Sequence, residues 1–220
     1  AESDKVAGVV ANSGVLNVAT GAAGLAAAKE MSSAAATLFA DLWGSDERPA
    51  LVAQTGIIGE VPAIDRIRSG IADAGLSLSE DGGPDFAEAI MTTDTVPKSR
   101  AVRLEIGGSV VTVGGAAKGA GMIAPNMATM LAFLTTDAAL TPDAARALLV
   151  PAVNESFNRI SIDGDMSTSD MCLLLANGES AVAVEPGAES GRRFAQALAA
   201  LCEALAVDLV RDAEGVTRIC

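Results

Sequence analysis

A threonine within a glycine- and methionine-rich stretch is the strongest candidate for chemistry. Thr129 lies in the run Asn-Met-Ala-Thr-Met-Leu at 126–131. Its hydroxyl needs a base, and the sequence contains no histidine, which excludes Ser-His-Asp, Cys-His and HExxH sites. If the Ala128–Thr129 peptide bond were cut, the freed α-amine, with a pKa of about 7.7–8.0, would be that base. The residue types alone leave open that Thr129 is an ordinary residue packed among methionines.

Two phosphate-binding interpretations of the same glycine-rich stretch fit less well. A P-loop needs Ser or Thr directly after its lysine, whereas Lys118 is followed by glycine. The pattern at 119–124 fits the dinucleotide fingerprint GxGxxA, and Asp137 has the spacing of a ribose-binding acid. However, Pro125 opposes a helix there and no strand leads directly into the first glycine. A dinucleotide site would therefore require a βαβ unit around this stretch.

Metal and disulfide sites are not indicated. The alternating oxygen side chains of 163–170 resemble a calcium loop, but the glycine is misplaced and no terminal glutamate follows. The three cysteines, Cys172, Cys202 and Cys220, show no CxxC spacing. We therefore expect no metal, no bound cofactor and a reducing compartment.

Composition narrows the class of protein. Half of the 220 residues are hydrophobic, enough for a sizeable core. The 15 basic and 28 acidic residues give a net charge of −13, which argues against nucleic acids and anionic membranes as partners. The sequence has no apolar run long enough to cross a bilayer and lacks the basic start of a signal peptide. We expect a cytoplasmic protein.

Strands and helices alternate along the chain, which predicts an α+β fold of the α/β sandwich type, with mixed sheets covered by helices, in one domain over 1–220. Turns are expected at 12–14 and 55–56, and a hairpin turn is expected at 107–109. Tight backbone bends are expected at 114–121 because of four glycines. Strands are expected at 6–10, 51–54, 102–106, 110–113 and 172–176. Helices are expected at 22–42, 62–74 (stopped by Gly75), 86–91, 141–158 (with Thr141 as N-cap, and kinked or divided at Pro151) and 191–205.

Six ordered motifs, distributed along nearly the whole sequence, resemble one family. The stretch 115–131 resembles the cleavage-site signature of the ornithine acetyltransferase family, the glutamate N-acetyltransferases of the cyclic arginine pathway. The other five motifs match in the same order at 12–21, 54–59, 89–95, 156–170 and 211–215. So many ordered matches are not expected by chance.

The resemblance implies a self-cleaving N-terminal-nucleophile enzyme. Autocatalytic cleavage behind Ala128 would give an α-chain, 1–128, and a β-chain beginning at Thr129, the nucleophile. Thr55, through its hydroxyl, and Gly56, through its backbone N–H, would form the oxyanion hole.

The resemblance also implies which residues bind substrate. Thr92, Lys118, Thr129 and Glu214 would contact it, with Lys118 facing a carboxylate and Glu214 an ornithine-like amine. From the residues alone, a solvated loop residue is the better explanation of both Lys118 and Glu214. The sequence departs from the family pattern at 15–16 (Val-Leu), at Met166 and at Ala213, and family members are longer at both ends. We therefore expect a fragment whose amino-acid pocket is incomplete.

The expected reaction moves an acetyl group from N-acetylornithine to glutamate through an acetyl-Thr129 intermediate. Acetyl-CoA is a further donor in bifunctional members, and the expected assembly is a heterotetramer of two α and two β chains. Two alternatives stay open: an N-terminal-nucleophile amidohydrolase or aminopeptidase that passes the acyl group to water, and an inactive fragment that only binds.

Overall fold

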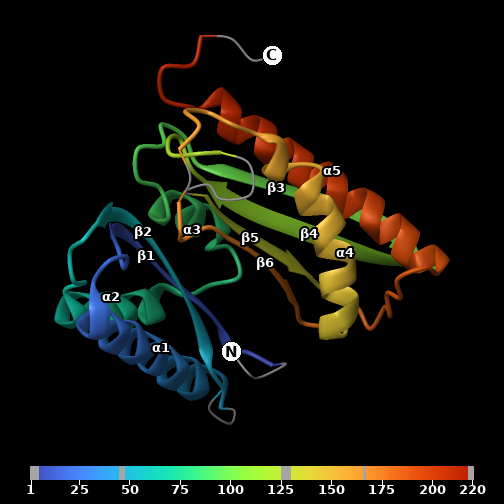
Figure 1. The fold of residues 1–220 in the computed structure, drawn as a ribbon. Coiled ribbons are helices and arrows are strands. Elements are labelled where there is room, and N and C mark those ends of the chain that lie inside the picture. Colours follow the sequence, from blue (N-terminus) through green and yellow to red (C-terminus); the bar gives the residue numbers. More distant parts are fainter. Residues whose placement is uncertain (1–4, 45–47, 125–129, 166, 218–220) are drawn as a thin grey trace. The chain divides into compact units, whose positions relative to one another are not determined.

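The computed structural model describes residues 5–44, 48–124, 130–165 and 167–217, which are coloured in Figure 1. The chain forms two compact units, residues 1–92 and 93–220. This division concerns packing, so the predicted single domain over 1–220 stays a prediction. Each unit combines helices with a sheet, and the expected α+β class is confirmed.

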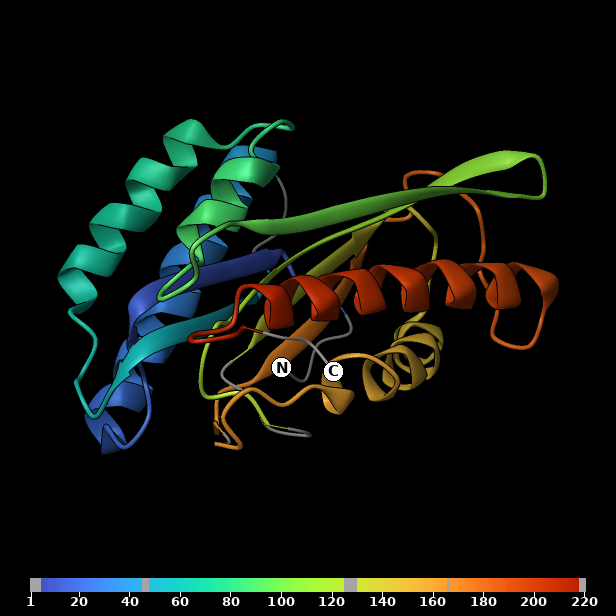
Figure 2. The same cartoon turned by 90° about the horizontal axis from the view of Figure 1, so that it is seen from above.

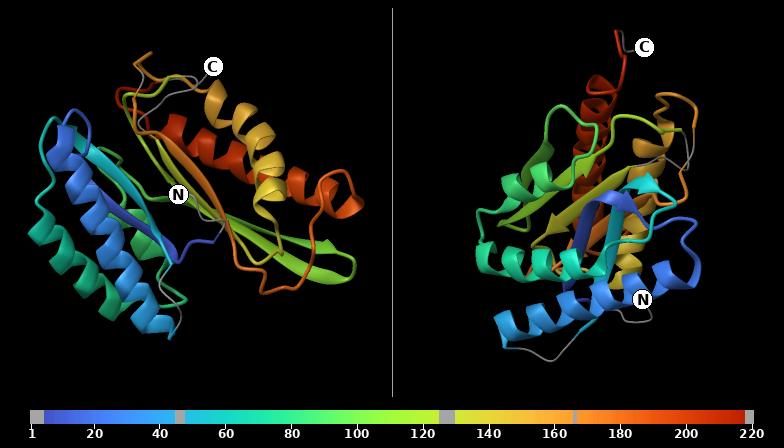
Figure 3. Two further views of the ribbon diagram at one scale, coloured as in Figure 1. Left: turned by 60° about the horizontal axis from the view of Figure 1, so that its bottom comes forward. Right: turned by 90° about the vertical axis from the view of Figure 1, so that its left-hand side faces the viewer.

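The first unit is built around two parallel strands. Strands β1 (Gly8–Leu16) and β2 (Ala50–Ile58) pair in register from Gly8 opposite Ala50 to Leu16 opposite Ile58. Parallel neighbours need a crossover connection, which is helix α1 (Gly21–Trp43). Helix α2 (Ile64–Ser77) packs on α1, and both lie on the same side of the strand pair (Figure 3). The short helix α3 (Gly83–Ala89) follows.

Helix α1 follows from its sequence. Small or flexible side chains recur every three or four residues on its buried side, at Gly24, Ala27, Met31 and Ala35. Gly44, with φ of +56°, ends the helix in the left-handed conformation that favours glycine. The predicted helix at 22–42 is confirmed within one residue at each end.

Two predicted turns in this unit were wrong, because β1 and β2 are longer than expected. The turn expected at 12–14 is part of β1, and residues 55–56 belong to β2. Gly14 and Gly56 are paired across the strands with φ of +116° and +130°. A Cβ at Gly56 would lie 2.2 Å from the carbonyl carbon of Gly14. The two glycines therefore allow the strands to continue through a backbone conformation that other residues rarely adopt.

Helix α2 also differs from its prediction. It begins at Ile64 and runs through Gly75, which was expected to stop it. A Cβ at Gly75 would lie 2.6 Å from Leu38 Cδ1 in α1. This glycine therefore makes room for a neighbouring helix, a role that local sequence does not reveal. The predicted helix at 86–91 begins three residues earlier, as α3.

The second unit contains a mixed four-stranded sheet. Its strand order is β3 (Lys98–Ile106), β4 (Ser109–Lys118), β5 (Leu131–Thr136) and β6 (Met171–Ala176). Strand β4 is antiparallel to both β3 and β5, and β6 is parallel to β5. Helix α5 (Glu189–Arg211) packs against β3 and β4, and α4 (Pro142–Asn154) packs against α5 (Figures 1 and 2). A short 3₁₀ helix spans Phe157–Arg159.

One face of α5 supplies much of the core. Phe194, Leu198, Leu205 and Leu209 are fully buried at helical spacing and join a cluster with Val113 of β4 and other sheet residues. Each buried leucine or phenylalanine of this kind stabilises the fold by roughly 1.5–3 kcal/mol. The predicted helix at 191–205 is confirmed, but α5 is longer, reaching Arg211.

The hairpin prediction is confirmed and the bend prediction is wrong in part. Gly107 and Gly108 both have positive φ, as a two-residue hairpin turn requires. In contrast, residues 114–118 do not bend but complete β4. A Cβ at Gly115 would lie 2.6 Å from Leu134 Cδ2 and 3.3 Å from Leu205 Cδ1. Gly115 therefore gives space to the core rather than flexibility to a loop.

Helix α4 begins as predicted and ends earlier. Thr141 caps it by accepting a hydrogen bond from the Ala144 N–H (3.2 Å), with proline in the first turn. The helix runs through Pro151 to Asn154, so it is not divided there and does not reach residue 158. No helix in the described part of the chain is long and apolar enough to span a bilayer.

The Gly14–Gly56 pair gives a stability prediction. We expect Gly56→Ala to destabilise the chain by about 3 kcal/mol or more, because its methyl group meets the backbone of the paired strand. Gly14→Ala is the matched control, since a Cβ there has no neighbour within 4 Å; backbone strain alone costs about 1–2 kcal/mol. Urea unfolding of both variants measures the difference, and equal losses would contradict the steric argument.

Candidate active site

The predicted cleavage site itself, Ala128 and Thr129, lies outside the described residues, as does Met166. The site is therefore built from the chain on either side. On one side β4 ends at Lys118 and leads to Ala124; on the other, Met130 leads into β5.

Asp163 holds the backbone before the cleavage site. Its carboxylate accepts hydrogen bonds from the backbone N–H groups of Met122 and of Ile123 (3.0 Å from Oδ1). The Ile162 N–H donates in turn to the carbonyl of Ile123 at 2.8 Å. Met122 has φ of +54°, a conformation that is uncommon outside glycine. The acidic stretch that resembled a calcium loop therefore fixes the backbone of a tight turn.

Asp170 holds the backbone after the cleavage site. Its Oδ1 accepts the Met130 N–H at 2.8 Å, and the carbonyl of Met130 accepts the N–H of Met171 at 3.1 Å. Met130 is thus held on both sides of its Cα. The other oxygen of Asp170, Oδ2, is buried and has no hydrogen-bond partner among the described residues. Burial raises the pKa of Asp170 to about 6, although the Met130 N–H and the charge of Lys118 act in the opposite direction.

Lys118 is buried at the end of β4, not solvated in a loop. It is 2 % exposed, and it pairs with Leu131 of β5. Its Nζ lies 4.0 Å from Asp94 Oδ2. Burial is the largest influence and lowers the pKa of Lys118; Asp94 raises it, Lys98 lowers it and Asp170 raises it. A buried ammonium group beside the cleavage-site strand suits the binding of an anionic substrate group.

A buried ion cluster surrounds Lys118. Asp94 Oδ1 accepts hydrogen bonds from Lys98 Nζ and from the Gly119 N–H, both at 2.7 Å. Lys98 Nζ also contacts Asp212 Oδ2 at 2.6 Å. Asp212 accepts further hydrogen bonds from the hydroxyl and, at 2.9 Å, the backbone N–H of Thr95. The cluster therefore joins the start of β3, the end of β4 and the end of α5.

Sequence reasoning missed the members of this cluster. Asp94 lies within the motif at 89–95 and Asp212 within the motif at 211–215. Their place in two family motifs was a usable signal. The spacing of four residues between Asp94 and Lys98 was another, but nothing in the local sequence shows that both are buried.

Glu214 contacts the turn that follows Lys118. Its backbone N–H donates to the carbonyl of Ala120 at 2.8 Å. A Cβ at Gly121 would lie 3.2 Å from Glu214 Oε1. Glu214 is exposed, in agreement with a solvated loop residue, but its side chain covers the glycine-rich turn. The second unit thus brings Lys118, Glu214 and the Met130 backbone to the two ends of the cleavage-site segment.

The other three predicted site residues lie in the first unit. Thr55 is 1 % exposed and lies in β2 opposite Ser13. Gly56 follows it in the same strand, and Thr92 is an exposed residue after α3. Their proposed roles are discussed below.

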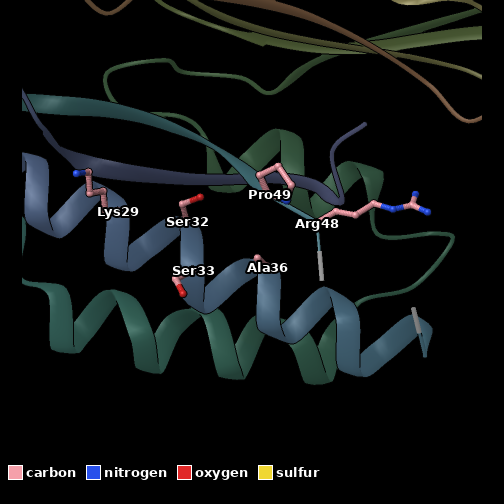
Figure 4. Close-up of a pocket in the computed structure, with 6 residues that line it drawn as sticks. All are labelled: Lys29, Ser32, Ser33, Ala36, Arg48 and Pro49. Carbon is pink, nitrogen blue, oxygen red and sulfur yellow. The ribbon is translucent and has the colours of Figure 1, made fainter. Parts of the chain in front are cut away.

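A hollow in the first unit contains none of the predicted site residues. It has a volume of about 390 Å³ and is lined by Lys29, Ser32, Ser33, Ala36, Arg48 and Pro49. Figure 4 shows Lys29 and Arg48 at opposite ends, so their charges do not converge on one point. Among the described ranges, no group of three or more acidic or cysteine residues is arranged to hold a metal ion.

Comparisons with known proteins identify the family. The model of the ArgJ family matches residues 1–220. The chain is 51% identical to "Arginine biosynthesis bifunctional protein ArgJ" of Symbiobacterium thermophilum over 99% of its own length and 54% of that protein. It is 44% identical to the protein of the same name from Bacillus subtilis, over 96% of the chain and 51% of that protein. The chain therefore spans about half the length of these relatives.

A solved structure gives a similar fold at low identity. The L-aminopeptidase D-Ala-esterase/amidase of Ochrobactrum anthropi, described as a new variant of the Ntn hydrolase fold, matches 87% of this chain and 65% of its own. The TM-score is 0.51 and the identity 14%, so the similarity concerns the fold alone. It agrees with the expected fold class. Together with the match over the whole chain, these findings confirm the family predicted from the six motifs: the chain belongs to the ArgJ family.

Proposed function

We propose that this chain carries the nucleophile of an acetyltransferase of arginine biosynthesis, which moves an acetyl group from N-acetylornithine to glutamate. The names of its ArgJ relatives place them in arginine biosynthesis. The observation that carries the proposal is the buried Lys118, held at the end of the strand that leads into the predicted cleavage site. Asp94 lies beside this ammonium group within the fold, and a charged donor held in place in this way can form a strong, charge-assisted hydrogen bond with a substrate carboxylate.

The first step creates the nucleophile. The Thr129 hydroxyl attacks the carbonyl carbon of Ala128 and displaces the Thr129 nitrogen, and water then hydrolyses the resulting ester, which leaves Ala128 with a carboxyl group and Thr129 with a free α-amine. In the processed enzyme this α-amine takes the proton of the threonine hydroxyl. The hydroxyl oxygen attacks the acetyl carbonyl of N-acetylornithine. The oxyanion is stabilised by the Thr55 hydroxyl and the Gly56 N–H, and one such donor contributes about 3–4 kcal/mol.

The second step transfers the acetyl group. Ornithine leaves with the proton, and the acetyl group remains on the Thr129 oxygen as an ester. The amine of glutamate attacks this ester, forms N-acetylglutamate and returns the proton to the threonine oxygen. Lys118 binds a carboxylate, Glu214 binds the ornithine-side amine and Thr92 completes the contact with substrate.

The proposed enzyme consists of two processed chains. Residues 1–128 belong to the α-chain and residues from 129 to the β-chain, assembled as two of each in the cytoplasm. The part of the relatives that this chain does not span completes the amino-acid pocket. The relatives are named as bifunctional proteins. A second activity of this kind in the present protein would use acetyl-CoA as a further acetyl donor.

Thr129→Ala in the full-length protein tests the nucleophile. We expect neither processing nor acetyl transfer, because both use the same hydroxyl. Intact mass spectrometry measures processing, and Thr135→Ala, at an exposed position of β5, is the matched control. Normal cleavage of Thr129→Ala would overturn the assignment.

Dependence on glutamate separates a transferase from an amidohydrolase. With N-acetylornithine alone, we expect release of about one ornithine per active site, followed by rapid turnover only when glutamate is added. Steady hydrolysis without glutamate would show that water is the acceptor. No ornithine release from the processed enzyme under either condition would support the binding fragment.

Asp170 gives the site a measurable pH dependence. Its pKa of about 6 in the folded chain lies above its ordinary value. The stability it contributes is therefore present at low pH and is lost as the pH rises through 6. We expect Asp170→Asn, which removes the charge but keeps an acceptor for the Met130 N–H, to become more stable than the unmutated chain as the pH rises from 3.8 to about 6, and to keep that advantage unchanged above pH 6. After solvent screening the gain is about 1 kcal/mol.

Thermal or urea unfolding at several pH values measures this difference. Glu203→Gln, at an exposed position of α5, controls for the loss of one negative charge. A stability difference for Asp170→Asn that does not change with pH, or that changes in parallel with Glu203→Gln, would show that Asp170 is not protonated as proposed.

A further inference from the structure

We propose that Asp94 is a positioning residue that holds the Lys118 ammonium group and the Gly119 N–H in place for a substrate carboxylate. The inference rests on the proposed function, because it takes Lys118 as the carboxylate-binding group. Asp94 is not assigned a contact with substrate; it acts through Lys118.

The geometry of one carboxylate carries the proposal. The side chain of Asp94 is 0 % exposed. Its Oδ1 accepts the Gly119 N–H at 2.7 Å, and its Oδ2 lies 4.0 Å from Lys118 Nζ. The same carboxylate therefore contacts the side chain of one residue and the backbone of the next. Rotation of β4 at its end would break both contacts, so Asp94 sets the direction in which Lys118 leaves the sheet.

Lys98 competes with Lys118 for the negative charge of Asp94. Lys98 Nζ lies 2.7 Å from Asp94 Oδ1 and 2.6 Å from Asp212 Oδ2, so it is held between two carboxylates. Asp94 thus divides its charge between two ammonium groups. The two lysines repel each other, since Lys98 acts to lower the pKa of Lys118. An incoming carboxylate relieves this repulsion and is favoured for that reason.

The charge of Lys118 depends on this balance. The charged groups that act on it are Asp94, Lys98 and Asp170, in addition to burial. Burial lowers its pKa, and Asp94 is the largest influence in the opposite direction. Loss of the Asp94 charge therefore lowers the pKa of Lys118 further. A neutral lysine does not bind a carboxylate, so binding is lost at a lower pH than in the unmutated enzyme.

Asp94→Asn in the full-length processed enzyme is the direct test. The amide oxygen can still accept the Gly119 N–H, so the substitution isolates the charge. We expect the KM for N-acetylornithine to rise about tenfold near pH 8 with kcat changed less than about threefold, and the difference to shrink towards pH 6. The matched control is Asp208→Asn, which removes the same charge from the Arg100–Asp208 pair between β3 and α5, where the arginine is exposed and the aspartate is partly exposed. It should leave the KM within about twofold at each pH.

A second variant shifts the balance the other way. Lys98→Met removes the repelling ammonium group, so that Lys118 no longer shares the Asp94 carboxylate with Lys98. In the unmutated enzyme the KM is expected to rise with pH as Lys118 loses its proton. In Lys98→Met this rise should begin at a higher pH, because the pKa of Lys118 is no longer lowered by Lys98. A defect in folding alone would not shift the rise to a higher pH. If Asp94→Asn does not fold, this variant decides the question: an unchanged or lowered onset would overturn the proposal.

Lys118→Met separates this inference from the proposed function. If Lys118→Met leaves the KM unchanged, Lys118 does not bind the substrate and the proposed role fails with the inference. If Lys118→Met raises the KM but Asp94→Asn follows the unmutated enzyme at every pH, the inference alone is overturned. The inference would also be overturned if Asp94→Asn changed KM and kcat by the same factor, relative to the unmutated enzyme, at every pH.

Discussion

Burial of four charged side chains is the constraint on which the second unit depends. Asp94, Lys98, Lys118 and Asp212 are almost completely withdrawn from solvent. An isolated charge in such a position would cost several kcal/mol, so these groups are stable only together. They come from the segment before β3, from β3 and β4 themselves and from the end of α5. Correct placement of each element is therefore a condition for placing the others.

The same helix satisfies both the apolar core and the ion cluster. The leucines of α5 pack on the sheet at helical spacing, and Asp212, its C-terminal cap, binds Lys98 and Thr95. A shift of α5 by one residue would turn the leucines away from the core and would also separate Asp212 from Lys98. Glu214 follows two residues later, and its N–H is paired with Ala120. Packing far from the site thus determines where this proposed substrate-binding residue lies.

Features that depend on adjacent residues, such as helix caps and hairpin turns, were predicted from the sequence. Features that depend on residues far apart in the sequence were missed. The N-cap at Thr141 and the Gly107–Gly108 hairpin are local, and both were predicted. Gly56 and Gly115 were expected in turns, because their strand partners cannot be read from the adjacent sequence. Lys118 was identified only through resemblance, and its burial was not foreseen. Asp94 and Asp212 were missed because charged residues are usually solvated, and only the folded chain brings them together.

Two aspartates hold the backbone on either side of the predicted cleavage site, and this arrangement is compatible with the proposed cleavage. Asp163 binds the N–H groups of Met122 and Ile123, and Asp170 binds that of Met130. Hydrogen bonds to a charged acceptor are about twice as strong as those between neutral groups. None of these bonds involves the Ala128–Thr129 peptide, so none is lost when it breaks. The proposed cleavage therefore frees an α-amine while both flanking segments stay attached to the sheet and its loops.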